Sequence, residues 1–186
     1  MRLFVAVFPP AEIQRAASSV IESLRRPGDG VSWVKPDNLH YTLRFIGEVG
    51  EDGARRVAEA AREAVRGRRA FEATLGGVGA FPNARRARVI WLGMIVGEAE
   101  LVAIARALED GVVKRGFDRE DKAFSAHLTL GRVREPKADW TAQLAAARVP
   151  DAQALRFRIE RVSVVQSQLS PKGSIYQVRE EAVLDA

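Results

Sequence analysis

Apolar and polar positions follow two periods along this chain, one typical of strands and one typical of helices. Apolar runs of strand length occupy residues 3–7 and 90–94. Each run is followed by apolar residues at helical spacing, over residues 11–25 and 98–112. Two well-separated parts of the chain therefore each begin with a predicted strand and a predicted helix.

The later elements recur with the same offset, which is 127 − 40 = 87 residues when it is measured between the two histidines. Residues 52–66 predict a helix, and residues 139–148 predict its counterpart, which Pro150 ends. Strand-like segments at 71–81 and 87–94 correspond to segments at 158–168 and 174–181. The chain is thus expected to contain an internal repeat, which lies in the order of its strands and helices, with low sequence identity between its halves.

Each repeat reads strand–helix–strand–helix–strand, and one extra strand remains at the end. This order predicts an α+β fold of two pseudo-symmetric lobes, each a mainly antiparallel sheet with helices on its outer face. A pseudo-twofold axis would place equivalent sheet faces on either side of a cleft. Because no Gly-, Ser- or Pro-rich linker separates the halves, residues 1–186 are expected to form one bilobal domain.

Composition narrows the classes of chemistry that this chain can perform. Hydrophobic residues make up 47% and charged residues 28%, as in ordinary folded soluble proteins. The absence of cysteine excludes disulfides, thiol nucleophiles and thiolate metal sites, and it fits a reducing compartment. The net charge of +5 favours a polyanion such as nucleic acid, although basic residues that only solvate helix faces would give the same balance.

The apolar residues at the start of the chain do not have the pattern of a signal peptide. Residues 3–8 are too short for the apolar region of a signal peptide, and Pro9 and Pro10 end the run, so a first strand is expected. No stretch approaches the roughly 20 apolar residues of a membrane span. We therefore expect a cytoplasmic protein without a membrane partner, and nothing in the sequence demands more than a monomer.

The two histidines carry the most specific chemical pattern in the chain. His40 and His127 are its only histidines, and each begins a His-x-Thr-Leu phrase, at residues 40–43 and 127–130. In a strand, residues two positions apart point to the same face, so each phrase presents an imidazole beside a hydroxyl. The repeat would bring the two faces together across the cleft.

Two such imidazoles suit acid–base work on a phosphoryl group without a metal. One can take a proton from the attacking oxygen while the other gives a proton to the leaving oxygen, which predicts a bell-shaped pH profile. The hydroxyls of Thr42 and Thr129 can hold the non-bridging oxygens as charge develops. The alternatives are two unrelated structural histidines, or a zinc site, which would need a carboxylate ligand that neither histidine has at ligand spacing.

Both phrases resemble the paired His-x-Thr-x motifs of the 2H phosphoesterase superfamily, at residues 33–47 and 127–132. Residues 81–82, 88–93 and 169–176 also look like the branch of RNA 2′,3′-cyclic phosphodiesterases, the ThpR or LigT type. The resemblance covers nearly the whole chain. It implies hydrolysis of RNA or nucleoside 2′,3′-cyclic phosphate ends to 2′-phosphomonoesters, without metal or cofactor. It makes His40 the proton donor to the departing 3′-oxygen and His127 the proton acceptor that activates water.

Further substrate contacts are expected beyond the motifs. Arg132 matches a family position suited to phosphate contact, but strict alternation turns it away from the face of His127, unless Gly131 marks a bulge. Arg44 shares the parity of His40 and is a second candidate phosphate ligand. Phe45, the repeat partner of Arg132, could stack on a base or could pack in the core.

Basic residues near the predicted turns give weaker indications. Arg85, Arg86 and Arg88 could follow an RNA backbone or could be a solvated hairpin end, and Lys172 could lie at the mouth of the cleft. The expected partners are RNA 3′ ends or nucleotides with a 2′,3′-cyclic phosphate. The alternatives are a 2H enzyme for another small cyclic phosphate such as an ADP-ribose derivative, a 2′-5′ RNA ligase, and a non-catalytic module that binds RNA ends.

Overall fold

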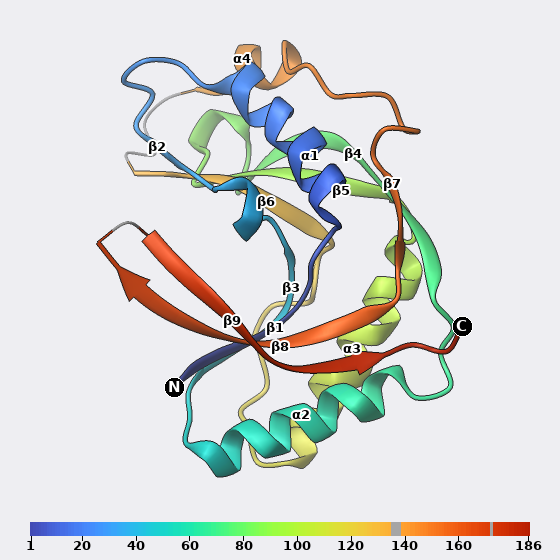
Figure 1. Cartoon of the computed structure of the whole chain (residues 1–186). Helices are drawn as coiled ribbons and strands as arrows, with labels where there is room; N and C mark the ends of the chain where they lie inside the picture. Colours follow the sequence, from blue (N-terminus) through green and yellow to red (C-terminus); the bar gives the residue numbers. More distant parts are fainter. Residues whose placement is uncertain (135–138, 172) are drawn as a thin grey trace.

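One strongly curled antiparallel sheet organises the computed structural model, which describes residues 1–134, 139–171 and 173–186 (Figure 1). Across the sheet the strands are β7 (Arg156–Ile159), β4 (Phe71–Phe81), β5 (Val89–Val96), β6 (His127–Val133), β3 (Tyr41–Glu48), β1 (Arg2–Val7), β8 (Arg161–Ser170) and β9 (Gly173–Val183). A short strand, β2 (Val31–Trp33), pairs with β6 off this path. The predicted α+β class with mainly antiparallel pairing is confirmed.

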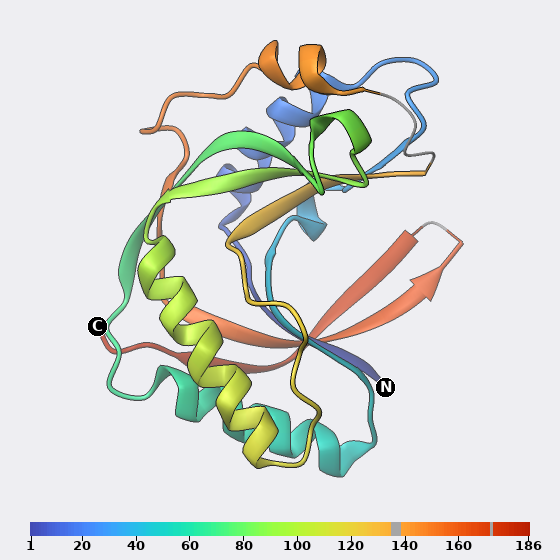
Figure 2. The ribbon, with the colours of Figure 1, turned by 180° about the vertical axis from the view of Figure 1, so that it is seen from behind.

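The sheet divides into two arms that meet between β3 and β6. The first arm holds β1, β3, β8 and β9 with helices α2 (Glu51–Val65) and α3 (Glu98–Lys114). The second arm holds β2, β4, β5, β6 and β7 with helices α1 (Ala11–Leu24) and α4 (Thr141–Ala145). The two opposite views show the helices on the outside of the curl (Figures 1 and 2).

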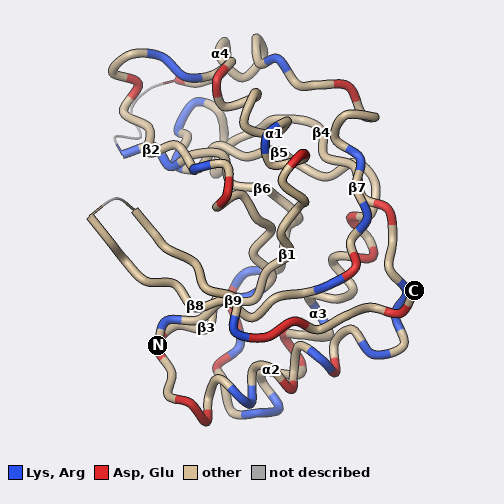
Figure 3. Tube along the Cα trace, in the orientation of Figure 1, with Lys and Arg blue, Asp and Glu red and all other residues tan. Residues whose placement is uncertain are grey.

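Strand alternation places the main core between the sheet and these helices. In β1, Leu3, Val5 and Val7 are buried in that core, whereas Phe4 and Ala6 belong to a separate small cluster on the concave face. The charged residues of α2 are exposed except for the half-buried Arg56, and positive and negative residues follow one another along the helix (Figure 3). The concave face is therefore left free for a site.

The predicted repeat is present, but the lobes exchange their third strands. Strand order β4-β5-β6-β3-β1-β8 maps onto itself when the two repeats are interchanged, as a pseudo-twofold axis requires. However, β4 is the third strand of the first repeat and joins the second arm, while β8 is the third strand of the second repeat and joins the first arm. The first helices of the two repeats, α1 and α3, are exchanged in the same way. The expectation that each lobe is one continuous half of the chain is therefore wrong.

Two elements of the structure differ in extent from their predictions. The strand expected at 158–168 is two strands, since the chain leaves the edge of β4 after Ile159, begins β8 at Arg161 and pairs with β1 over Ser163–Ser167. The helix expected at 139–148 covers only Thr141–Ala145. It starts late because Trp140 is buried and its backbone N–H donates to the carbonyl of Ala84, which fixes the chain before the helix begins. Strand β2 was not predicted, since three residues give no period.

No helix in the described parts of the chain combines the length and the apolar character that crossing a membrane requires.

Candidate active site

The two histidine motifs meet where the arms join. Only one residue pair, Tyr41 with Leu128, connects β3 to β6, and both side chains are fully buried beneath the concave face. In an antiparallel pair the flanking residues follow in opposite order. His40 therefore lies across from Thr129, and Thr42 lies across from His127. We call this the crossed arrangement, since each imidazole faces the hydroxyl of the other motif.

Both imidazoles are held in the same way by a carbonyl two residues earlier. His40 Nδ1 lies 2.7 Å from the carbonyl oxygen of Asn38, and His127 Nδ1 lies 2.8 Å from that of Ser125. A carbonyl only accepts, so Nδ1 carries the proton and donates in both rings. In each ring Nε2 is then the nitrogen available to take or give a proton in the cleft.

Aromatic side chains surround the ring of His40. The ring centroids of Phe4, Phe8 and Tyr176 lie 4.9, 5.2 and 5.3 Å from that of His40. Burial lowers the pKa of His40 below its ordinary value, the Asn38 carbonyl partly offsets this, and the positive charges of Arg132 and His127 lower the pKa further.

His127 has one aromatic neighbour of this kind, Phe81, whose ring meets it edge-on at 5.0 Å. Burial also lowers the pKa of His127, the hydrogen bond to the Ser125 carbonyl raises it, and the charge of Arg132 lowers it. Both imidazoles are thus kept neutral more readily than a free histidine. An anionic phosphate between them would oppose this effect and favour protonation.

The same bulge interrupts both motif strands at equivalent positions. In β6 the register skips Leu130 between Thr129 and Gly131, and in β3 it skips Leu43 between Thr42 and Arg44. The skipped residues are separated by the repeat offset, 130 − 43 = 87. Each bulge reverses the alternation of the strand after it.

Because of these bulges, Arg132 and Phe45 share the cleft face with the histidines. Arg132 lines the cleft, as the hypothesis of a bulge at Gly131 predicted. Gly131 itself has no room for a side chain, since a Cβ there would lie 2.7 Å from the ring of Trp33 on β2. Phe45 is 51% exposed and lines the cleft, so the alternative of a core phenylalanine is wrong.

The parity argument for Arg44 fails for the same reason. The bulge at Leu43 turns Arg44 away from the face of His40, and its side chain is buried. Its guanidinium contacts the carboxylates of Glu109 and Glu120 at 2.5 and 3.0 Å. Although Arg44 forms part of the wall of the cleft, its charge is neutralised by these carboxylates, and we do not retain it as a phosphate ligand.

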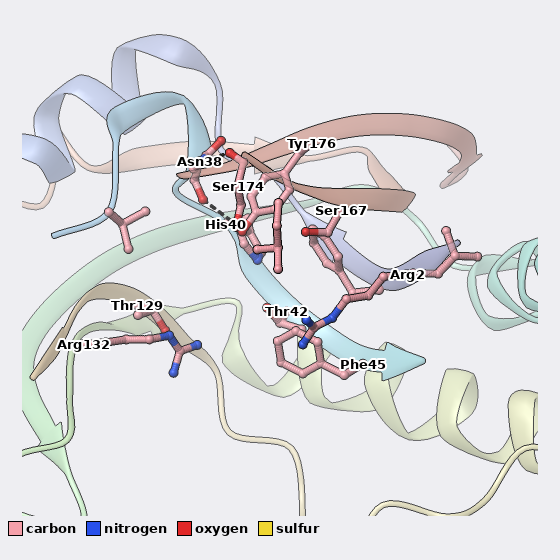
Figure 4. Close-up of a pocket in the computed structure, with 14 residues that line it drawn as sticks. Arg2, Asn38, His40, Thr42, Phe45, Thr129, Arg132, Ser167, Ser174 and Tyr176 are labelled. Atoms are coloured by element: carbon pink, nitrogen blue, oxygen red, sulfur yellow. Dashed lines mark hydrogen bonds between the residues drawn. The ribbon is translucent and has the colours of Figure 1, made fainter. Parts of the chain in front are cut away.

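Two adjoining pockets form the cleft. Figure 4 shows the pocket on the side of His40. The pocket on the side of His40 has a volume of about 450 Å³, and the pocket on the side of His127 has a volume of about 670 Å³. Both are lined by Thr42, Phe45, Thr129 and Arg132. These four side chains thus occupy the middle of the cleft, with one histidine to each side.

Sequence reasoning missed a row of side chains on the first arm. Strand pairing aligns Arg2 with Ser167 and Ser167 with Tyr176, and all three line the pocket of His40. Alternation in residues 2–8 would have placed Arg2 with Phe4 and Phe8 on the concave face. Ser167 and Tyr176 could not be found in this way, because nothing in the sequence says that β8 pairs with β1.

The basic residues named from sequence lie in different places. Arg88 lines the pocket of His127, whereas Arg85 and Arg86 belong to a short 3₁₀ helix at Ala84–Arg86. Lys172 lies outside the described residues. In residues 1–134, 139–171 and 173–186, no group of three or more His, Asp or Glu side chains is placed to hold a metal ion.

Comparison with known proteins identifies relatives over the whole chain. Residues 7–91 and 95–176 match the family described as LigT like Phosphoesterase. A Methanothermobacter thermautotrophicus protein named RNA 2′,3′-cyclic phosphodiesterase is 36% identical over 95% of this chain and 95% of its own length. One of the same name from Archaeoglobus fulgidus is 38% identical over 95% of this chain and 97% of its own length.

Solved structures agree with these relationships. A Thermus thermophilus crystal structure aligns with a TM-score of 0.81 and 32% identity, covering 99% of this chain and 98% of that one. Escherichia coli LigT complexed with 3′-AMP aligns with a TM-score of 0.79 and 26% identity, covering 100% of this chain and 98% of that one.

Proposed function

Because the chain belongs to the LigT-like phosphoesterase family, we propose that it is an RNA 2′,3′-cyclic phosphodiesterase that yields 2′-phosphomonoesters by metal-independent two-histidine catalysis. The observation that carries this proposal is the crossed arrangement around Tyr41 and Leu128. It places one imidazole on each side of the two threonine hydroxyls, at the border of the two pockets, which is where the phosphate is expected to bind.

In the proposed reaction one histidine takes a proton from the attacking water and the other gives a proton to the departing oxygen. Water attacks the phosphorus opposite the 3′-oxygen, and Nε2 of neutral His127 takes a proton from that water. The bond between phosphorus and the 3′-oxygen breaks, and Nε2–H of protonated His40 gives its proton to that oxygen. The product keeps its phosphate on the 2′-oxygen, and proton exchange with solvent restores both imidazoles.

The middle of the cleft would hold the phosphate during this reaction. The hydroxyls of Thr42 and Thr129 and the guanidinium of Arg132 are donors for the non-bridging oxygens, which carry most of the charge in the transition state. Arg132 is also the only one of the three with a full charge, so it is expected to contribute most to stabilising that state.

Assigning His40 to the 3′-oxygen determines the side on which the nucleoside lies. The ribose carries that oxygen, so the sugar and its base occupy the pocket of His40, while water enters from the side of His127. Phe45, half-exposed at the border of the two pockets, is then placed to stack on the terminal base.

The test of this function is turnover of a short RNA that ends in a 2′,3′-cyclic phosphate, with excess chelator present. We expect chelator-resistant conversion to a 2′-phosphate, identified by its resistance to an enzyme that removes only 3′-phosphates. A 3′-phosphate product would contradict the assignment of His40 to the 3′-oxygen. Loss of turnover in chelator, restored by a divalent metal, would contradict the metal-independent mechanism.

The same assay separates the alternative functions. Faster turnover of a small cyclic phosphate such as an ADP-ribose derivative would indicate a different 2H substrate. A joined product when a 5′-hydroxyl RNA is added would indicate a 2′-5′ ligase. Salt-dependent binding of the RNA end without any turnover would indicate a binding module.

Phe45→Leu is expected to raise KM for the RNA substrate with little change in kcat. Stacking of a base on an aromatic ring contributes about 1–3 kcal/mol, so KM should rise about 5- to 150-fold. Phe45→Trp should keep KM near its original value. Steady-state kinetics on this substrate and on one with an abasic terminal ribose check the cause, because the abasic substrate should not distinguish Phe45 from Leu.

Val183→Ala is the matched control for Phe45, since Val183 is an exposed apolar strand residue, 63% accessible, at the end of β9 distant from the cleft. It should leave KM unchanged. An equal loss by Phe45→Leu on the normal and the abasic substrate would show that Phe45 shapes the cleft and does not stack on the base.

A further inference from the structure

A buried cluster of charges lies directly behind the cleft, on the first arm. Arg44 of β3 and Glu109 of α3 are both largely buried, and their side chains form an ion pair with Nε and Oε2 2.5 Å apart. Nη1 of Arg44 also donates to the carbonyl of Phe45, its neighbour in the strand. This pair therefore connects the outer helix to the strand of the first motif.

The same two side chains hold a segment that has no regular structure. This segment lies between the end of α3 at Lys114 and the start of β6 at His127. Arg44 donates to the carbonyl of Asp118 and to a carboxylate oxygen of Glu120 in it, the latter at 3.0 Å. Glu109 accepts the backbone N–H of Glu120 at 2.8 Å. Segment 117–126 is thus tied at residues 118 and 120 to the far side of the sheet.

This segment determines the surroundings of His127. Its last residues include Ser125, whose carbonyl accepts the Nδ1 proton of His127. Phe124 and Lys122 line the pocket of His127. We propose that Arg44 and Glu109 are a positioning pair for His127, holding segment 117–126 so that Ser125 fixes the tautomer and direction of the imidazole.

The corresponding carbonyl for His40 is held by different residues, so the pair acts on one histidine only. Asn38 lies in the short 3₁₀ helix Pro36–Asn38, and its side-chain amide donates to the carbonyl of Ser174 at 3.0 Å. Gln14 of α1 donates to the carbonyl of Leu39 at 3.0 Å. Removal of Arg44 and Glu109 should therefore leave the ring of His40 in place.

The paired variant Arg44→Gln/Glu109→Gln tests this inference, because it removes both charges and leaves no unpaired buried ion. The chain has only two histidines, so ¹⁵N-histidine labelling gives two imidazoles whose nitrogen shifts report the tautomer and the pKa of each. We expect His127 to lose its single tautomer and to titrate at lower pH, with His40 unchanged. With a misdirected base, kcat should fall about tenfold or more and KM should change much less.

The matched control is Arg119→Gln/Asp110→Asn. These residues form an exposed ion pair, at 3.1 Å, between the same segment and the same helix, and neither contacts the ring of His127 or its carbonyl. This control should match the wild type in kcat and in both imidazole spectra. Glu120→Gln, which alters only the contact on the side of the segment, serves if the paired variant does not fold, and it should show a smaller change of the same kind.

A folded variant with normal kcat and an unchanged His127 would overturn the inference. Equal changes in both imidazoles with a lower melting temperature would also overturn it, since they indicate a general effect on stability. The inference rests on the proposed function for the role of His127, but the imidazole spectra do not require turnover. A shifted His127 in a protein without activity on cyclic phosphates would therefore support the positioning pair and reject the proposed function.

Discussion

His127→Ala is expected to lower kcat for a short RNA 2′,3′-cyclic phosphate by about 10²- to 10⁴-fold, and His40→Ala is expected to have an effect of the same order. Each substitution removes one of the two Nε2 atoms that the crossed arrangement presents to the phosphate. Thr42, Thr129 and Arg132 remain in both variants, so KM should change much less than kcat. Steady-state kinetics at fixed salt, with melting temperatures as a check of folding, measure both effects.

The two histidines can be told apart with a substrate in which sulfur replaces the 3′-bridging oxygen. A thiol has a pKa near 8.5, far below that of an alcohol, so the sulfur can leave without receiving a proton. His40→Ala should therefore regain most of its activity on this substrate, whereas His127→Ala should not, because water still needs a base. The opposite pattern would reverse the assigned roles. A variant that lacks both histidines should be little less active than the less active of the two single variants.

The sequence was sufficient to predict that the two motifs line one cleft, because that prediction depends on local spacing and on the repeat. His and Thr two positions apart share a face in any strand, and the offset of 127 − 40 = 87 residues already indicated that His40 and His127 occupy equivalent positions. The arrangement of the arms was not available in this way. Exchange of β4 and β8 between the arms depends on which edges pair, and hydrophobic periodicity carries no information about edges.

The treatment of Arg44 and Phe45 shows where local reasoning is incomplete. A bulge was considered for β6, where Gly131 suggested one, but not for β3, which has Arg44 at the equivalent position. Applying the repeat to the bulge itself would have exchanged the two assignments, because Phe45 is the counterpart of Arg132 and must share its face. In a protein with internal symmetry, a backbone irregularity inferred in one half is thus a prediction for the other half.

The charge of Arg132 makes it the residue with the second largest expected effect. It lines both pockets, and its positive charge lowers the pKa of His40 and of His127. Arg132→Met removes a charged donor to the transition state, so kcat/KM should fall about 10²- to 10³-fold. It also removes the charge that disfavours both imidazolium ions, so both pKa values should rise.

The direction of the pH effect follows from these shifts. In the wild type both histidine pKa values are lowered from 6.5, so the bell-shaped profile of kcat/KM should have its maximum on the acid side of pH 6.5. Arg132→Met should move both limbs of the profile to higher pH. Arg134→Met is the control, since Arg134 is exposed, donates to the hydroxyl of Ser32 at 2.8 Å and affects neither histidine. A profile that stays in place while kcat/KM falls would show that Arg132 binds the phosphate without setting the charge of the histidines.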